Sequence, residues 1–147
     1  MYKVLIADDE PFILEGLADL INWEEHGLQI AGLVSNGLDA KNIVDSSDID
    51  ILITDNRMPR MDGIELIKYI AQTEKNIKFI ILSGYNDFEY VKEAAKIGIE
   101  NYLLKPVDEK ELISTLINTV DKIENEIYKK KELQQGYNIL RDNIHFR

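Results

Sequence analysis

Five short apolar segments recur along the chain, and stretches with helical spacing of apolar residues lie between them and after the last one. The segments cover residues 2–7, 28–34, 50–55, 77–83 and 101–104. Strands that alternate with helices in this way form right-handed βαβ units, which produce a parallel sheet. We therefore expect an α/β fold of the (βα)5 type. Its five-stranded, doubly wound sheet would have the strand order 2-1-3-4-5, with helices on both faces.

The third segment ends on an acid. Residues Ile51 to Thr54 are apolar apart from the threonine, which is typical of a strand buried on both faces. Asp55 follows, and Pro59 and Gly63 predict a loop before the next helix. An acid at this position lies on the sheet edge where open parallel sheets bind ligands. A single such aspartate is about as often a helix cap or a turn former, so its neighbours decide the interpretation.

Two helix starts carry the pattern of a capping box. Asn86 is followed by Glu89, and Asp108 is followed by Glu111. Because these acids have a local structural role, we exclude them from the candidate site.

Polar residues follow the other strands at the same edge of the sheet. The candidates after strands one, three, four and five are Asp8, Asp9, Glu10, Asp55, Ser83 and Lys105. In the expected strand order, strands one and three are neighbours, so their aspartates lie within a few ångströms of each other. Carboxylates that close repel each other by roughly 1 kcal/mol per pair in water, and more strongly in a protein cleft. Mg2+ held by few carboxylates, with positions left open for phosphate oxygens, offsets this repulsion best.

A metal ion and a lysine that face one carboxylate form a site for phosphoryl transfer. The two cations neutralise the transferring oxygens while the carboxylate of Asp55 attacks phosphorus. Ser83 would donate its hydroxyl hydrogen to a phosphoryl oxygen. Taken singly, Ser83 is more often a turn residue, Lys105 a solvated surface lysine and Glu10 only a helix cap. The interpretation depends on five separated positions that reach one edge with the required side chains.

The overall composition is that of one globular domain. The 147 residues are 45% apolar and 30% charged, and the absence of cysteine excludes disulfides and thiolate metal sites. A net charge of −10 argues against nucleic-acid binding by this chain alone. We find no targeting segment and no apolar run near the about 18 residues of a membrane span. We expect a cytoplasmic protein without membrane contact.

The C-terminal part of the chain has a different composition. From about Asp121 it is rich in Lys, Glu, Gln and Asn, although Ile123 and Ile127 continue an apolar stripe. We expect one helix from Asp108 to about residue 130, which packs on the sheet through Leu112, Leu116, Ile117 and Val120. The six-residue step from Ile127 to Leu133, together with Gly136, predicts that the helix stops or bends before residue 137.

Several motifs together resemble the receiver domain of bacterial two-component response regulators. They are Ala7-Asp8-Asp9-Glu10, Thr54-Asp55 with Met58-Pro59 and Met61-Asp62-Gly63, Ser83-Gly84-Tyr85, and Tyr102-Leu103-Leu104-Lys105-Pro106. The match covers about residues 1–125 in order and spacing, and it implies a CheY-like, flavodoxin-like fold. The remaining residues, 126–147, would form a helical linker extension that leads to an absent C-terminal DNA-binding domain.

The resemblance also implies roles for individual residues. Asp55 would be the phosphoacceptor, and Lys105 the phosphate-binding lysine before a peptide bond to Pro106 that the family usually makes cis. The direct Mg2+ ligands would be Asp9, Asp55 and the backbone carbonyl of Arg57, with Asp8 reaching the metal through water. Ser83 and Tyr102 would be the switch pair.

The segments Ser83-Gly84-Tyr85-Asn86-Asp87-Phe88-Glu89-Tyr90 and Lys105-Pro106-Val107-Asp108 resemble receivers attached to AraC-type transcription factors. The implied partners are a sensor histidine kinase and a second copy of the chain, in a phosphorylation-dependent homodimer. DNA would be reached only through the missing C-terminal domain. The chain is then a fragment of a longer regulator or, alternatively, a stand-alone receiver. Asn56, directly after the phosphoacceptor, departs from the common family pattern, which often has an apolar residue there. Arg57 and Tyr85 flank the entry to the phosphate site.

Two other functions compete with this interpretation. A Mg2+-dependent phosphohydrolase of the dehalogenase-like kind needs a second acid two residues after its nucleophile, but Arg57 occupies that position after Asp55. A pseudo-receiver, which binds partners without taking phosphate, would have lost one of the acids, the lysine or the hydroxyl. All of them are present here.

Overall fold

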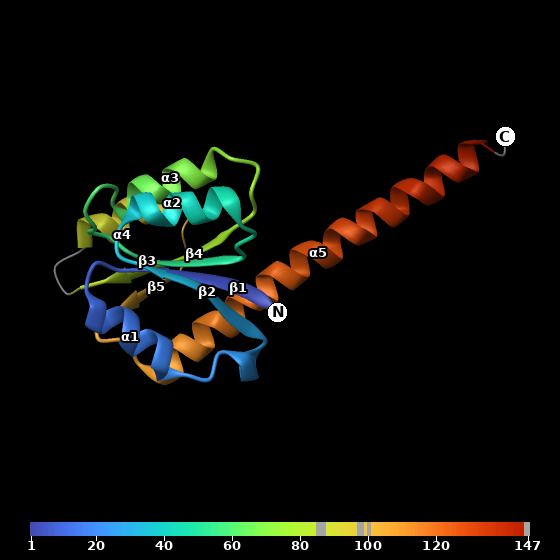
Figure 1. Ribbon diagram of the computed structural model, residues 1–147. Helices are drawn as coiled ribbons and strands as arrows, with labels where there is room; N and C mark the ends of the chain where they lie inside the picture. The colour runs from blue at the N-terminus through green and yellow to red at the C-terminus, as the bar shows by residue number, and fades with distance from the viewer. Residues whose placement is uncertain (85–87, 97–98, 100, 146–147) are drawn as a thin grey trace. The chain divides into compact units, whose positions relative to one another are not determined.

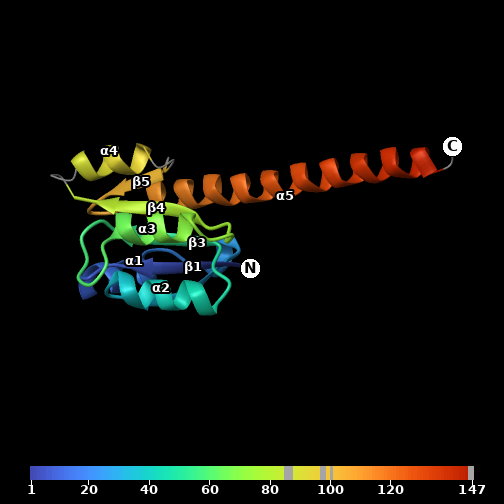
Figure 2. The ribbon, with the colours of Figure 1, turned by 90° about the horizontal axis from the view of Figure 1, so that it is seen from above.

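The computed structural model describes residues 1–84, 88–96, 99 and 101–145. Within these residues, five parallel strands form one sheet in the order β2-β1-β3-β4-β5 (Figure 1), which confirms the predicted fold. The strands are β1 (Tyr2–Ala7), β2 (Leu28–Val34), β3 (Ile51–Asp55), β4 (Lys78–Ser83) and β5 (Asn101–Leu104). Each strand begins and ends within one residue of its predicted bounds. Figure 2 shows the strands side by side from β5 through β4 and β3 to β1.

The connecting helices cover both faces of the sheet. They are α1 (Pro11–Leu20), α2 (Gly37–Ser46), α3 (Gly63–Ala71), α4 (Phe88–Lys96) and α5 (Glu109–His145), with a short 3-10 turn η1 (Glu24–His26) before β2. Helices α2, α3 and α4 lie on one face, whereas α1 and the first turns of α5 lie on the other (Figure 1). The described chain forms two compact units, one from Met1 to Thr115 and one from Leu116 onward.

Burial along the strands follows their place in the sheet. All five residues of the central strand β3 are buried, as are the last four of β1 and of β4. The edge strand β2 alternates between more and less exposed residues after Leu28. Strands with helices on both faces must be apolar throughout, whereas an edge strand can present alternate side chains to water. The sequence pattern of β3 therefore locates the middle of the sheet.

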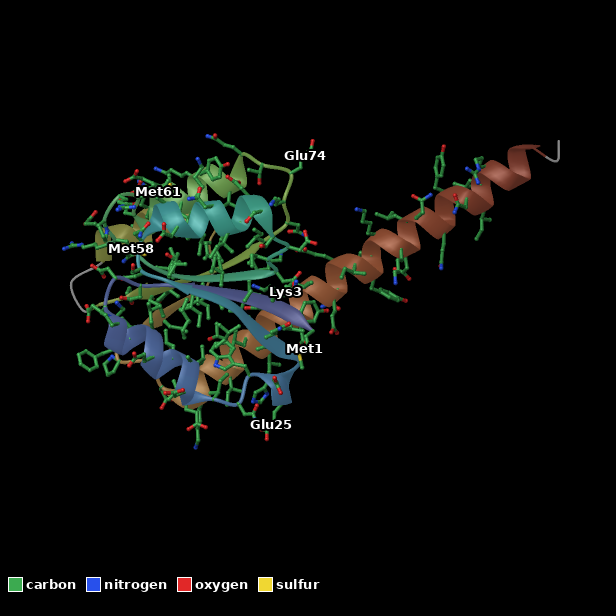
Figure 3. The ribbon with its side chains drawn as sticks, in the orientation of Figure 1. Met1, Lys3, Glu25, Met58, Met61 and Glu74 are labelled. Carbon is green, nitrogen blue, oxygen red and sulfur yellow. The ribbon has the colours of Figure 1, made fainter. Side chains whose placement is uncertain are left out.

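A hydrophobic core lies between β1, β3 and β4 and the helices α2 and α3. Its fully buried members include Leu5, Leu52, Leu66, Ile67 and Ile70. Strand β3 is in continuous register with both of its neighbours, with Leu52 of β3 beside Leu5 of β1 and beside Phe79 of β4. Because the register is continuous to the strand ends, the carboxyl ends of β1, β3 and β4 lie next to each other. Figure 3 shows Met58, after β3, at this edge, and Lys3 near the opposite one.

Polar side chains fix the start of three helices. The side chain of Asn36 accepts a hydrogen bond from the backbone of Asp39 at 2.8 Å at the start of α2. Asp62 accepts one from the backbone of Glu65 at 2.8 Å at the start of α3. The predicted Asp108 cap is also present, with Oδ2 of Asp108 3.1 Å from the backbone nitrogen of Glu111. The predicted box at Asn86 and Glu89 falls partly outside the described residues.

Gly63 allows α3 to start directly against the end of β3. A Cβ atom at position 63 would lie 2.2 Å from the carbonyl oxygen of Asp55, which no side chain could tolerate without movement of the backbone. The backbone nitrogen of Gly63 donates to the carbonyl of Asn56 at 2.9 Å. This hydrogen bond fixes the loop that connects β3 to α3.

Two expectations about α5 are wrong. The helix is continuous over 37 residues and passes through Gly136 without a break. One glycine in a helix costs only about 1 kcal/mol relative to alanine, and the lysines, glutamates and glutamines around it favour the helix. Leu112 and Leu116 are buried as expected, but Ile117 is 47% exposed and Thr119 is buried instead. Residue 119 is three positions after 116, so it shares that face of the helix, whereas 117 is turned away from it.

Candidate functional site

Asp8 is the first residue after β1 and is completely buried. Its backbone nitrogen donates to the carbonyl of Val34 at 3.0 Å, which extends the pairing of β1 with β2 by one residue. Its side-chain Oδ1 accepts a hydrogen bond from the backbone nitrogen of Glu10 at 2.9 Å. The carboxylate is therefore held at the sheet edge by the turn that leads into α1.

Asp55 is the last residue of β3, and it is only 6% exposed. Its Oδ1 accepts a hydrogen bond from the backbone nitrogen of Asn56 at 2.8 Å. The side chain of Thr54 turns the other way and donates to the carbonyl of Asp55 at 3.0 Å. These contacts aim the carboxylate of Asp55 along the edge of the sheet, toward the residues that follow β1 and β5.

Lys105 joins the two buried carboxylates. Its Nζ lies 2.8 Å from Oδ2 of Asp8 and 3.2 Å from Oδ1 of Asp55. The backbone nitrogen of Lys105 donates to the carbonyl of Ser83 at 2.8 Å, so the end of β5 is tied to the end of β4. The peptide bond from Lys105 to Pro106 is cis, as the family resemblance implied. Residues from three strands thus meet at one point.

The electrostatic environment raises the pKa of Asp55 from 3.8 to about 6. Burial of its carboxyl group is the largest cause, and the negative charge of Asp8 adds to it, whereas Lys105 opposes the shift. Burial also lowers the pKa of Lys105, but the hydrogen bond to Asp8 and the two negative charges outweigh this effect and raise it overall. Near neutral pH the site therefore holds an ionised Asp55 beside a charged lysine.

Three acids at the start of α1 can offer oxygen ligands to a metal ion. Carboxylate oxygens of Asp8, Asp9 and Glu10 lie within 4.8 Å of one another, and Asp9 and Glu10 are exposed. The expectation that Glu10 acts only as a helix cap is wrong, because it occupies the N-cap position of α1 without a capping hydrogen bond from its side chain. Hard oxygen donors of this kind fit Mg2+, so these three acids are compatible with the predicted ion. The group does not include Asp55, which is a predicted direct ligand.

The remaining predicted residues occupy different environments. Ser83 is buried, with 1% exposure, and its hydroxyl oxygen has no hydrogen-bond partner. Tyr102 lies on β5 with 52% of its surface exposed, and Arg57 is exposed in the loop after β3. Tyr85, which was predicted to flank the entry to the site, lies outside the described residues. The metal-ligand and switch roles of these residues stay predictions.

Asn56 has a larger part in the site than the sequence suggested. It is fully buried, and neither its Oδ1 nor its Nδ2 has a hydrogen-bond partner. A polar residue directly after a buried apolar strand was the available signal, but the sequence alone left open whether the side chain points toward the helices or toward the edge.

A doubly wound sheet of this order, with buried aspartates and a lysine where its strands end, defines the CheY-like class of flavodoxin-like α/β domains. The chain belongs to the family of response regulator receiver domains, since the model of that family matches residues 4–117. It is accordingly a receiver domain of a two-component system, a signalling domain rather than an ordinary enzyme.

Curated relatives of the chain are transcriptional regulators. It is 44% identical over 132 residues to the transcriptional regulatory protein YesN of Bacillus subtilis, which covers 89% of this chain and 36% of YesN. It is 40% identical over 112 residues to the transcriptional regulatory protein HptR of Staphylococcus aureus, which covers 76% of this chain and 44% of HptR. The chain therefore spans less than half the length of these relatives.

Solved structures of AraC-type regulators are similar as well, which confirms the predicted relationship. The receiver domain of AraT, a response regulator from Geobacillus stearothermophilus, has a TM-score of 0.80 at 36% identity, covering 85% of this chain and 97% of that one. A two-component transcriptional regulator AraC from Clostridium phytofermentans has a TM-score of 0.78 at 34% identity, with the same coverage. Among the helices that the structure describes, none is long and apolar enough to cross a membrane.

Proposed function

We propose that Asp55 is the phosphoacceptor of this receiver and takes a phosphoryl group from a sensor histidine kinase. The observation that carries the proposal is the position of Lys105, whose Nζ lies 3.2 Å from Oδ1 of Asp55 and 2.8 Å from Oδ2 of Asp8. A cation in contact with a buried nucleophile can also contact the oxygens of a group that is transferred to that nucleophile.

In this reaction, a carboxylate oxygen of Asp55 attacks phosphorus and the bond from phosphorus to the kinase histidine breaks. The pKa of about 6 leaves Asp55 mainly ionised near neutral pH, and burial removes the water that would otherwise weaken its nucleophilicity. Lys105 stabilises the charge on the phosphoryl oxygens. We expect Asp9, Asp55 and the backbone carbonyl of Arg57 to hold Mg2+ directly, and Asp8 to hold it through water. When bound, this ion would neutralise part of the phosphoryl charge.

Phosphorylation would be transmitted through Ser83 and Tyr102. The new group adds roughly −1.5 to −2 charges next to Asp55, which attracts the hydroxyl of Ser83 as a hydrogen-bond donor. Movement of Ser83 would leave room for Tyr102, which now has 52% of its surface exposed, to turn inward. Such a change alters the surface formed by α4, β5 and α5.

We further propose that the altered surface promotes a homodimer and switches an attached DNA-binding domain. This part of the proposal is supported by the transcriptional regulators among the relatives, which are longer than this chain. Contact with DNA would be made by that domain, since the receiver carries a net charge of −10. A receiver served by a sensor kinase in this way would work in the cytoplasm.

The decisive experiment is incubation with acetyl phosphate and Mg2+, followed by measurement of the intact mass. We expect the gain of a single phosphoryl group that hydroxylamine removes, and no gain in Asp55→Asn. Asp19→Asn is the matched control, because Asp19 is an exposed acid of α1 outside the site. Full labelling of Asp55→Asn would refute the assignment. Absence of labelling in the unaltered protein would favour a pseudo-receiver, and steady release of phosphate from simple esters would favour a phosphohydrolase.

A further inference from the structure

We propose that Asn56 is a positioning residue of the phosphorylation switch, whose side-chain amide gains a hydrogen bond to Ser83 only when Asp55 is phosphorylated. The inference rests on the proposed function, because it assumes that the hydroxyl of Ser83 donates to a phosphoryl oxygen. The oxygen atom of the Ser83 hydroxyl can then accept a hydrogen bond from Nδ2 of Asn56. The result is a chain of two hydrogen bonds from the core to the phosphoryl group.

The first support is the state of the Asn56 side chain. The residue is fully buried, and both polar atoms of its amide lack a hydrogen-bond partner. Its backbone is fully engaged, with the nitrogen 2.8 Å from Oδ1 of Asp55 and the carbonyl oxygen 2.9 Å from the nitrogen of Gly63. The backbone contacts therefore hold the amide at a fixed place beside the phosphoacceptor.

The second support is the position of Ser83. Asp55 of β3 is paired with Leu82 of β4, and the next residues along the chain are Asn56, in the loop after β3, and Ser83, the last residue of β4. Adjacent parallel strands are about 4.8 Å apart, so Asn56 and Ser83 each directly follow one of two closely spaced residues. Ser83 is also buried, with 1% exposure, and its hydroxyl oxygen has no partner. Two buried polar groups without a hydrogen-bond partner thus directly follow the two residues of one strand pair.

Unsatisfied groups of this kind occur only near Asp55 in the part of the chain that the structure describes. The buried side-chain atoms without a hydrogen-bond partner belong to Asn56, Ser83 and Asp8, and Asp8 is in an ion pair with Lys105 at 2.8 Å. By contrast, Thr54, one residue before Asp55 on the same strand, is equally buried and has a partner at 3.0 Å. The missing partners are therefore a property of the site and not of the sheet as a whole.

A buried amide without a partner makes the unphosphorylated state less stable than it could be. From the usual cost of such a group, the equilibrium constant for folding is lower by roughly 5- to 150-fold. If phosphorylation supplies the partner, this cost disappears in the phosphorylated state only. A group that is better satisfied in one of two states shifts the population toward that state. Asn56 would thereby favour the active conformation without touching the phosphoryl group.

The test uses the variant Asn56→Leu, which keeps the branched shape of the side chain and removes the amide, with beryllofluoride and Mg2+ as the probe of the phosphorylated state. Without the probe, we expect the folding equilibrium constant from urea unfolding to rise by at least about 5-fold. With the probe bound, we expect this gain to vanish, so that beryllofluoride binds the variant at least about 5-fold more weakly than it binds the unaltered protein. Asn56→Val carries the same expectation if the leucine cannot be accommodated.

Two controls separate a switch residue from an ordinary core residue. Thr54→Val removes a hydroxyl whose partner is present in the unphosphorylated protein, and we expect the same change in stability with and without beryllofluoride. In a double-mutant cycle with Ser83→Ala, the coupling to Asn56 should appear with the probe and be absent without it.

Equal effects of Asn56→Leu in both states, while the unaltered protein binds beryllofluoride normally, would overturn this inference alone. Failure of the unaltered protein to bind beryllofluoride would instead overturn the proposed function, and the role of Asn56 with it.

Discussion

At the scale of single residues, Asp55 combines two demands that conflict. A nucleophilic carboxylate must be ionised, yet its burial and the charge of Asp8 favour the protonated form and raise its pKa to about 6. Lys105 limits this effect, because its ammonium group contacts both acids. Ionisation of Asp55 therefore lowers the stability of the folded protein, and the size of this effect depends on pH.

This cost predicts a pH dependence of stability in the absence of metal. Between pH 3.8 and about 6 the folded protein retains the proton on Asp55 that the unfolded chain has already lost, so stability falls as the pH rises through this range. The pKa shift corresponds to about 3 kcal/mol once Asp55 is ionised in both states. Asp55→Asn should therefore be more stable than the unaltered protein at pH 8, by up to that amount, and about equal to it at pH 4.

Urea unfolding in the presence of EDTA at several pH values measures this difference. Replacing Lys105 by Met should move the range to higher pH, because the cation that opposes the shift is lost. A stability difference between Asp55→Asn and the unaltered protein that does not change with pH would contradict the argument.

At the scale of elements, the site is positioned by the way strands end and helices begin. The edge around Asp55 depends on close contact between the end of β3 and the start of α3. Gly63 makes that contact possible, since any Cβ atom there would lie 2.2 Å from the carbonyl oxygen of Asp55. The side chain of Asp62 then caps the helix at 2.8 Å from the backbone nitrogen of Glu65. The start of α3 is therefore positioned by Asp62 and Gly63 rather than by helix propensity.

Two glycine substitutions test this conclusion. Gly63→Ala should destabilise the protein by several kcal/mol and slow phosphorylation, because the backbone of Asp55 must move to accommodate the methyl group. Gly16→Ala is the matched control in α1, where a Cβ atom would meet no other atom within 4 Å. There we expect a gain of about 1 kcal/mol from helix propensity alone. Thermal unfolding and the rate of labelling by acetyl phosphate measure both effects. A tolerated Gly63→Ala would show that the contact is not required.

At the scale of the whole molecule, the long helix α5 carries exposed apolar residues along its C-terminal part. Leu112 and Leu116 are buried, whereas apolar residues farther along are exposed, with 46% for Ile127, 75% for Leu133 and 61% for Tyr137. Leucine and isoleucine side chains left in water forgo about 1.5–3 kcal/mol of burial each. The exposed side chains do not form one straight stripe, because the step from Ile127 to Leu133 moves the apolar face around the helix.

Truncation after Glu126 tests what this segment contributes. We expect the shortened protein to unfold at nearly the same temperature and to accept a phosphoryl group at the same rate, since the site lies within the unit from Met1 to Thr115. We expect its phosphorylation-dependent self-association, measured by sedimentation, to be weaker than that of the full chain. Equal self-association of the two proteins would show that residues 127–147 have no part in the dimer.

The sequence by itself determined the fold and the residues that gather at the site. Runs of apolar residues identify buried parallel strands, and the order of those strands brings all their carboxyl ends to one edge. From this alone it follows that Asp8, Asp55 and Lys105 lie close together. Their contacts at 2.8 and 3.2 Å agree with that prediction. The start of α5 directly after Asp108 was also predictable, because a helix cap is a local feature of the chain.

Only the tertiary structure decided how the side chains are oriented and what surrounds them. The complete burial of Asn56 and the exposure of Ile117 depend on how distant segments pack against each other. No local pattern specifies such packing. Gly136 shows the same limit at the scale of an element, since its small local cost did not break a helix with many favourable residues. Local chemistry predicts where strands and helices begin and end, whereas the environment of each side chain is a property of the assembled fold.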